Sequence, residues 1–275
     1  MEDLGGRLAA ETPPTPDDLQ KLARFQADYQ PSLEEVVAVL RDRLHITSSG
    51  LFDGVALTTT SRPGKTIETL REKLRKGIPL RVIQDITGLR VVGDLRLSQQ
   101  NDLRDQIKKC FAGSRVDEDD RRVTPSSGYR AVHLIPVVLG LPVEIQLRTA
   151  SQDAWAQASE KLGDLWGRWH RYGLPPEGPT PEERERRGQF IEQYRLIGDA
   201  FYSHELVLDR EFVLRRQEEE LTLALERDSG SELSARLSEV RDLLEEVDTE
   251  QIESNKAIAV QVNRLVELSN LQSNQ

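Results

Sequence analysis

The chain has 275 residues, of which 37% are hydrophobic and 31% charged, and its net charge is −10. No apolar run approaches the roughly 20 residues that a membrane-spanning helix needs, and the first residues (MEDLGGR) lack the apolar core of a signal peptide. The single cysteine, Cys110, excludes an internal disulfide framework. Together these features predict a cytoplasmic protein without membrane segments.

The negative charge is unevenly distributed along the chain. Residues 205–275 carry a net charge of −9, whereas residues 62–90 carry +5. A basic cluster in an otherwise nearly neutral body indicates an anionic small molecule rather than a long polyanion. A solvated helix face can have the same composition, so the motifs around the cluster must decide.

The N-terminal part is predicted to be a tail followed by two helices. Residues 1–16 end in TPPTP and are expected to form a flexible tail, disordered or extended. Asp17 or Asp18 can cap a helix that runs to about Tyr29, and a second helix begins at Pro31.

The middle of the chain alternates strands and helices. We expect strands at residues 51–60 and 86–92, helices at 66–76 and 98–112, and an irregular charged segment at 114–125. A β-hairpin follows, with an outgoing strand over 126–138, a turn at 139–141 and a return strand over 142–149.

The C-terminal part is predicted to be helical. A helix at 150–169 and a linker at 173–183 precede a region, 181–275, that is almost entirely helix-forming. Its apolar positions alternate steps of four and three, as in a coiled-coil seam: Leu233, Leu237, Val240, Leu244 and Val247. Because the seam is short, a helical hairpin is favoured over a long coiled coil. The expected domains are a tail (1–16), a core domain (17–172) and a helical region (181–275).

The hairpin gathers polar side chains on one face. Side chains alternate along a strand, so Glu144, Gln146 and Arg148 share one face of the return strand. Tyr129 and His133 share one face of the outgoing strand. An exposed sheet face can have the same pattern, so the hairpin alone does not distinguish a site from ordinary surface.

Two upstream segments have the composition of a phosphate-binding site. Arg62 and Lys65 lie where a loop enters a helix, and Lys73 lies on that helix, so the two lysines can face one anion. Asp85 precedes a buried strand and, with Glu144, offers the oxygen ligands that Mg²⁺ prefers beside nucleotide phosphates.

Taken in this order, the motifs resemble the synthetase domain of the RelA/SpoT family of alarmone synthetases. The matching motifs are Asp85-x-x-Gly88-x-Arg90, Gly128-Tyr129-Arg130-x-x-His133 and Glu144-Ile145-Gln146-Leu147-Arg148-Thr149. The resemblance covers roughly residues 50–170. It implies an α/β (α+β) fold, with a nucleotidyltransferase-like mixed β-sheet flanked by helices and a C-terminal helical extension.

The resemblance also implies a Mg²⁺-dependent pyrophosphokinase, which transfers the β,γ-pyrophosphate of ATP to the 3′-hydroxyl of GDP or GTP and makes (p)ppGpp. No hydrolase domain is expected, because residues 1–50 are too short and no His-Asp dipeptide occurs. By position, the residues implied for ATP are Arg62 and Arg90 on the adenine and Lys65 and Lys73 on the phosphates. Asp85 and Glu144 are implied as the catalytic and metal-binding pair. The residues implied for the acceptor are Tyr129, by stacking on the base, and Arg130, His133, Gln146 and Arg148.

The acceptor and the partners stay open. Residues 123–127 lack the lysine that many family members carry there, so Arg121, Arg122 or Arg130 would have to hold the acceptor phosphates. One alternative is a toxin of a toxin–antitoxin pair that pyrophosphorylates adenine nucleotides or the 3′ end of tRNA. A basic run at 184–187 could bind tRNA, although the overall acidity weighs against this. A catalytically silent nucleotide sensor is disfavoured, because a sensor does not need two metal ligands. The acidic helices are expected to serve self-association, rather than antitoxin docking or simple capping of the fold.

Overall fold

The computed structural model describes residues 2–46, 49–62, 64–172, 174–227 and 230–273. The chain forms two compact units. The first comprises Met1–Asp94, Asn101–Asp120 and Ala131–Arg148, and the second comprises Leu95–Gln100, Arg121–Arg130 and Thr149–Gln275.

The first unit is built on a β-sheet with the strand order β1-β2-β3-β7-β5-β4, and β6 pairs with β5 off this path. The strands are β1 (Ser49–Phe52), β2 (Val55–Arg62), β3 (Gly88–Gly93), β4 (Val116–Asp120), β5 (Val132–Val138), β6 (Leu141–Pro142) and β7 (Glu144–Thr149). Most neighbours run antiparallel. The amide of Glu144 donates to the carbonyl of Thr87, so β3 and β7 start side by side and run parallel. The sheet is therefore mixed, as predicted.

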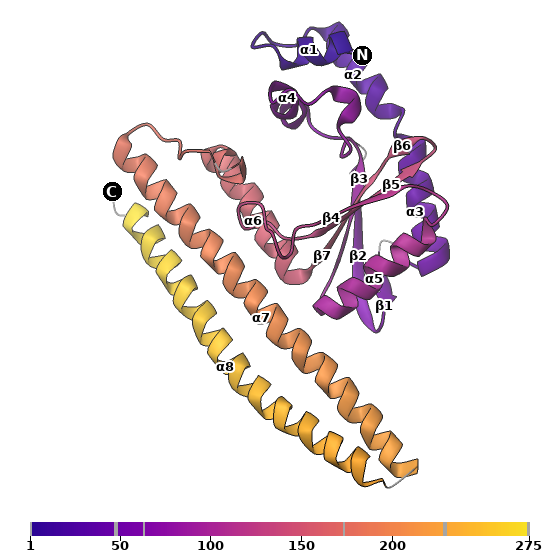
Figure 1. Ribbon diagram of the computed structural model, residues 1–275. Helices are drawn as coiled ribbons and strands as arrows, with labels where there is room; N and C mark the ends of the chain where they lie inside the picture. The colour runs from indigo at the N-terminus through magenta and orange to yellow at the C-terminus, as the bar shows by residue number, and fades with distance from the viewer. Residues whose placement is uncertain (1, 47–48, 63, 173, 228–229, 274–275) are drawn as a thin grey trace. The chain divides into compact units, whose positions relative to one another are not determined.

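Helices α3 and α5 lie side by side in the first unit (Figure 1), where Arg43 Nη1 donates to the carbonyl of Cys110 at 2.9 Å. The helices of this unit are α1 (Glu2–Ala9), α2 (Pro16–Ala27), α3 (Gln30–Leu44), α4 (Ile67–Arg75), the short 3₁₀ helix η1 (Leu80–Val82) and the larger part of α5 (Leu97–Cys110). The first turn of α5, up to Gln100, belongs to the second unit. The expected helices at these places are present, with ends shifted by a few residues.

The N-terminal segment differs from the expected tail. Glu2–Ala9 is a helix whose Leu4 and Leu8 are buried in a core with α2, α4 and η1. Arg71 of α4 donates to the carbonyls of Leu8, Ala10 and Thr12 and thereby satisfies the C-terminal end of α1. The prediction of a disordered or extended tail is wrong for α1, because two leucines one turn apart find an apolar partner surface only in the folded chain.

Two further segments differ from the sequence-based expectation. Residues 51–60 are part of a hairpin rather than one irregular strand, since Asp53 and Gly54 turn the chain with φ of 48° and 76°. The charged segment at 114–125 contains β4, which pairs antiparallel with β5. Acidic residues have a low intrinsic preference for strands, so the sequence pattern did not predict β4, which is stabilised by its pairing with β5.

The outgoing strand of the predicted hairpin is shorter than expected. It begins at Val132, because Ser127 and Gly128 have φ of 53° and 86° and form a turn. Tyr129 therefore precedes β5 and does not share a strand face with His133, contrary to the prediction. The return strand and the turn at Leu139 and Gly140 lie where the sequence placed them.

The second unit is mainly helical. Its elements include α6 (Ala150–Trp166), the 3₁₀ helix η2 (Trp169–Tyr172), α7 (Pro181–Arg227) and α8 (Ser231–Ser273). Helices α7 and α8 lie antiparallel (Figure 1), with ion pairs Arg210–Glu250 at 2.8 Å and Arg241–Glu218 at 2.9 Å. Leu214 of α7 packs against Val240, Leu244 and Val247 of α8, so the predicted helical hairpin is confirmed. Within the described ranges, no helix is long and apolar enough to cross a membrane.

Candidate active site

One face of the sheet carries most of the predicted site residues. Thr60 lies opposite Arg90 and Arg62 opposite Gly88 in the β2–β3 register, while His133 lies opposite Gln146 in the β5–β7 register. Directly opposed residues project from the same face of a sheet. A pocket of about 300 Å³ opens among β2, β3 and β7, and its lining includes Arg62, Arg90, Glu144 and Gln146. This volume lies at the lower end of the range for ligand sites.

Gly88 brings β3 and β7 unusually close together beside this pocket. A Cβ atom at this position would lie 2.4 Å from the carbonyl oxygen of Glu144, a separation that real Cβ atoms do not show. The sequence-based expectation that Gly88 permits close backbone approach is therefore confirmed, and the approaching backbone belongs to Glu144.

Two lysines converge on the carboxylate of Asp85, which lies just before β3. Lys73 Nζ of α4 lies 2.8 Å from Asp85 Oδ2, and Lys65 Nζ, from the loop before α4, contacts the same oxygen. Burial would raise the pKa of Asp85, but the two ammonium groups outweigh it and lower that pKa to about 2. Burial also lowers the pKa of Lys65, although Asp85 opposes that shift.

The second oxygen of Asp85 is available to a ligand. Oδ1 is buried, and among the residues that the structure describes none donates a hydrogen bond to it. A buried carboxylate oxygen without a partner is costly unless a metal ion or water supplies the missing contact. Asp85 can therefore bind two lysines on one oxygen and a cation on the other.

Gln26 of α2 holds the loop that carries Lys65, and the sequence analysis missed it. Its Nε2 donates to the carbonyl of Lys65 at 2.6 Å, and a Cβ at Gly64 would lie only 3.2 Å from that amide. No motif marks Gln26, because it lies 39 positions before Lys65. Only the packing of α2 on this loop discloses its role.

A chain of polar contacts runs along β7. His133 Nδ1 lies 2.8 Å from Glu144 Oε1, Gln146 Nε2 donates to Glu144 Oε2 at 2.7 Å, and Arg148 Nη2 donates to Gln146 Oε1 at 3.0 Å. Burial would raise the pKa of Glu144, but the contact with His133 outweighs burial, so the pKa lies below its usual value. Glu144 is therefore an anion in a nearly buried place.

The two carboxylates could hold a divalent cation. They lie at the same end of the parallel pair of strands, and the charge of Asp85 acts on Glu144 by raising its pKa. The described residues contain no group of three or more His, Cys, Asp or Glu side chains placed to hold a metal. Two carboxylates with further positions left to water and phosphate fit Mg²⁺, which usually keeps several waters.

Tyr129 and Arg130 belong to the second unit, and there the structure places them among other partners. Arg130 is buried and its Nη2 donates to Asp199 Oδ1 at 2.7 Å. The ring centroid of Tyr129 lies 6.0 Å from the guanidinium carbon of Arg121. The sequence analysis missed Asp199, which lies 69 positions after Arg130.

Residues 61–162 match the family model described as "Region found in RelA / SpoT proteins". Every residue that the motifs assigned to the site lies within this matched RelA/SpoT region. The resemblance predicted from the motifs is confirmed.

The chain is also similar to curated proteins and to solved structures. "Uncharacterized protein Rv1366" of Mycobacterium tuberculosis and "Uncharacterized protein Mb1401" of Mycobacterium bovis are each 40% identical over 148 residues, which is 52% of this chain and 52% of each relative. The chain thus spans about half the length of the curated relatives it matches. The crystal structure of small alarmone synthetase 1 from Bacillus subtilis covers 73% of this chain and 98% of its own, with 22% identity and a TM-score of 0.50. This likeness shows a shared fold.

Proposed function

We propose that the chain is a Mg²⁺-dependent nucleotide pyrophosphokinase that transfers the β,γ-pyrophosphate of ATP to the 3′-hydroxyl of GDP or GTP. The observation that carries this proposal is the carboxylate of Asp85, which contacts two lysines with one oxygen and leaves the other without a described partner. Such an arrangement suits a triphosphate with its metal ion. The RelA/SpoT region and the shared fold support the same reaction class.

The site residues divide the work by chemistry. Lys65 and Lys73 would bind the ATP phosphates, and the flat guanidinium groups of Arg62 and Arg90 would hold the adenine at the pocket. Asp85 and Glu144 would hold Mg²⁺, which when bound neutralises phosphate charge and favours in-line attack. In the transfer the 3′-oxygen bonds to the β-phosphorus, the bond from that phosphorus to the oxygen bridging to the α-phosphate breaks, and AMP leaves.

The acceptor's proton must pass to a base as the new bond forms. Glu144 is a candidate both for that role and for the metal.

The substrate assignment is tested by supplying acceptors separately. The chain is incubated with Mg²⁺, γ-labelled ATP and, one at a time, GDP, GTP, ADP or deacylated tRNA, and the products are resolved. We expect label on GDP or GTP together with release of AMP. Label only on tRNA or only on ADP contradicts the guanine acceptor and supports the toxin alternative.

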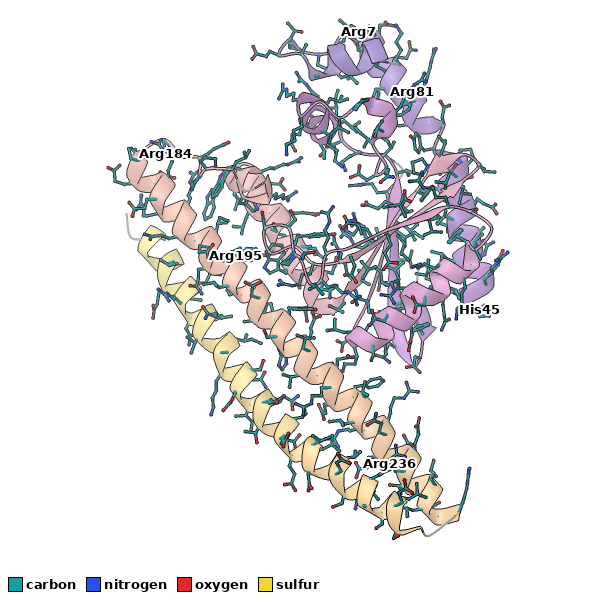
Figure 2. The ribbon with its side chains drawn as sticks, viewed as in Figure 1. Arg7, His45, Arg81, Arg184, Arg195 and Arg236 are labelled. Carbon is teal, nitrogen blue, oxygen red and sulfur yellow. The ribbon has the colours of Figure 1, made fainter. Side chains whose placement is uncertain are left out.

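The tRNA alternative lacks support in the basic run at 184–187. Arg184, at the start of α7 (Figure 2), donates to the carbonyl of Gly178 at 2.9 Å, and Arg187 pairs with Glu183 at 2.5 Å. These local contacts are those of an ordinary helix start. The guanine nucleotide acceptor is therefore preferred over a polyanion.

The metal-binding pair is tested by Asp85→Asn and Glu144→Gln. Each change removes one of two negative charges at the cation site, so we expect transfer to fall about 100-fold or more, measured as initial rate at saturating ATP and Mg²⁺. Asp105→Asn is the matched control, because Asp105 lies on α5, is half exposed and pairs with Arg104. A rate above one tenth of wild type in either site variant contradicts the assignment.

A further inference from the structure

The segment that carries Tyr129 is fixed at both neighbouring residues. Gly128 and Arg130 are buried in the second unit, whereas Tyr129 between them is partly exposed. Ser127 and Gly128 have positive φ values, so the chain turns just before Tyr129 instead of continuing as an extended strand. The residue proposed to stack on the acceptor base thus lies between two anchored residues.

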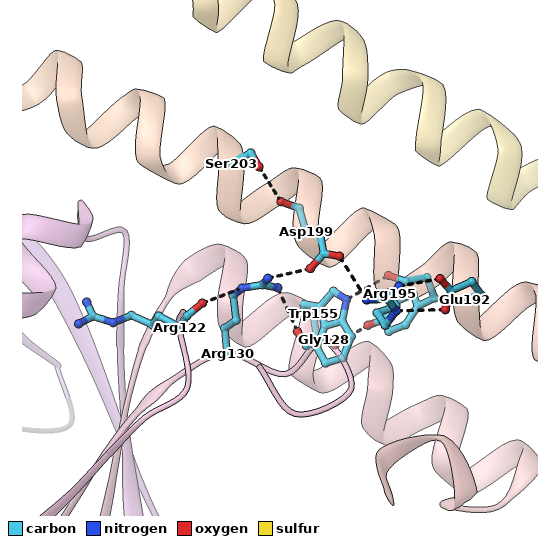
Figure 3. Close-up of polar contacts among 9 residues, drawn as sticks. Arg122, Gly128, Arg130, Trp155, Glu192, Arg195, Asp199 and Ser203 are labelled. Carbon is cyan, nitrogen blue, oxygen red and sulfur yellow. Dashed lines mark hydrogen bonds and ion pairs between the residues drawn. The ribbon is translucent and has the colours of Figure 1, made fainter. Parts of the chain in front are cut away.

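Arg130 is the first anchor, and Figure 3 shows its contacts. Its Nη2 donates to Asp199 Oδ1 of α7 at 2.7 Å, and its Nε donates to the carbonyl of Arg122 at 3.1 Å. Its guanidinium carbon lies 4.7 Å from the ring centroid of Tyr202, one turn further along α7. These contacts engage the guanidinium group of Arg130, so it is placed to hold the segment in position.

Gly128 is the second anchor. A Cβ atom there would lie 2.8 Å from the ring of Trp155, so the segment packs directly on α6. Trp155 is itself fixed by α7, because its Nε1 donates to the carbonyl of Tyr194 at 3.3 Å and the two rings stack with centroids 4.8 Å apart. Both anchors therefore depend on the same stretch of α7, from Tyr194 to Tyr202.

We propose that α7 positions residues 121–130, the segment that carries Tyr129. Asp199 is the positioning residue, because it holds Arg130 and thereby the ring of Tyr129. This inference rests on the proposed function for the role of Tyr129, while the anchoring itself follows from the contacts alone. The C-terminal helical region then fixes the segment that carries Tyr129, in addition to offering a candidate surface for self-association.

The test replaces Asp199 by Asn, which keeps the size of the side chain and removes the charge. Glu218→Gln is the matched control, since Glu218 is also an acid of α7 paired with an arginine, Arg241 at 2.9 Å. Asp199→Glu, which restores a carboxylate, is the conservative variant. Each protein is assayed for the KM of GDP, the KM of ATP and the kcat, and for hydrogen–deuterium exchange of residues 121–130 by mass spectrometry.

We expect Asp199→Asn to raise the KM for GDP roughly tenfold, as loss of a charged hydrogen bond predicts, with the KM for ATP within about twofold of wild type. Exchange of residues 121–130 should become faster in Asp199→Asn, stay unchanged in Glu218→Gln and return toward wild type in Asp199→Glu.

If exchange of residues 121–130 is unchanged in Asp199→Asn, Asp199 does not anchor this segment. If the KM for GDP and the KM for ATP rise equally, the role of Asp199 is not confined to the acceptor. Absence of transfer by the wild-type chain to any acceptor overturns the proposed function instead. In that case the exchange measurement still decides whether Asp199 anchors the segment.

Discussion

At the residue scale, Asp85 and the two lysines form a compact charge cluster before any substrate binds. Lys65 is 8% exposed, so its ammonium group needs an anion, and Asp85 supplies one within the chain. The triphosphate proposed to bind here carries several negative charges and can take over that partnership. The cluster thus aims both lysines at one point, as a preorganised site for the proposed triphosphate would require.

At Gly88 the backbone of β7 leaves no room for a side chain. Gly88→Ala places a methyl group 2.4 Å from the carbonyl of Glu144, so β3 and β7 must separate. We expect the free energy of unfolding to fall by about 1–3 kcal/mol, measured by urea denaturation, together with a loss of transfer activity. Gly113→Ala is the control, because its Cβ would have no described atom within 4 Å. Equal stability of the two variants contradicts the close approach.

At the element scale, α1 and α2 support α4 and the loop that carries Lys65, which a disordered tail could not do. They pack with α4 and η1 in one apolar core, and α2 contacts the Lys65 loop through Gln26. Asp18 ties the two helices together, since its carboxylate accepts from Arg7 Nε at 2.7 Å and from Thr15 Oγ1 at 2.7 Å. The position of Lys65, which is proposed to bind phosphate, therefore depends on a residue that precedes the matched RelA/SpoT region.

The contribution of Asp18 to stability should depend on pH. The hydrogen bonds from Arg7 and Thr15 lower its pKa from 3.8 to about 2. Because the folded-state pKa lies below the unfolded one, the stabilisation is complete above about pH 4 and is lost as the pH falls toward 2. Urea unfolding should therefore show wild type more stable than Asp18→Asn at pH 6 and equal to it near pH 2.

Asp17→Asn is the control for this prediction. Asp17 is exposed and pairs with Lys21 on the surface of α2, so its loss should change stability little at either pH. A difference between wild type and Asp18→Asn that stays constant from pH 6 to pH 2 would contradict the assignment.

At the scale of the whole molecule, self-association of the chain stays a prediction. Exposed apolar side chains lie along α8, where Ile252 is 56%, Val260 62% and Val266 49% exposed. We expect light scattering to give a mass of at least twice the 31.2 kDa of one chain. Val260→Glu should lower that mass if this surface takes part, because a charge would then be buried between copies. A wild-type mass of about 31 kDa rejects self-association.

The domain division predicted from the sequence also stays a prediction. Residues 121–130 and 149–172 fall in the same compact unit as α7 and α8, so the unit boundaries run through the predicted core domain 17–172. Sequence composition marks linkers rich in proline and glycine, but it cannot show which helix a distant loop packs against.

The sequence by itself determined the resemblance to a RelA/SpoT region, the helices and strands with strong periodicity, and the polar face of β7. Local alternation fixes which side chains share a strand face, so Glu144, Gln146 and Arg148 could be grouped without coordinates. Lys65, Lys73 and Asp85 could be assigned to one site because their motifs occur in the order typical of the family.

Only the tertiary structure decided which residues support that site. The burial of Leu4 and Leu8, the contact of Gln26 with Lys65 and the pairing of Arg130 with Asp199 each join segments far apart in the chain. The physical reason is that hydrogen bonds and apolar contacts depend on distance in space, whereas sequence patterns report only neighbours along the chain. The chemical character of the motif residues could therefore be predicted from the sequence, whereas the distant residues that hold them in place could not.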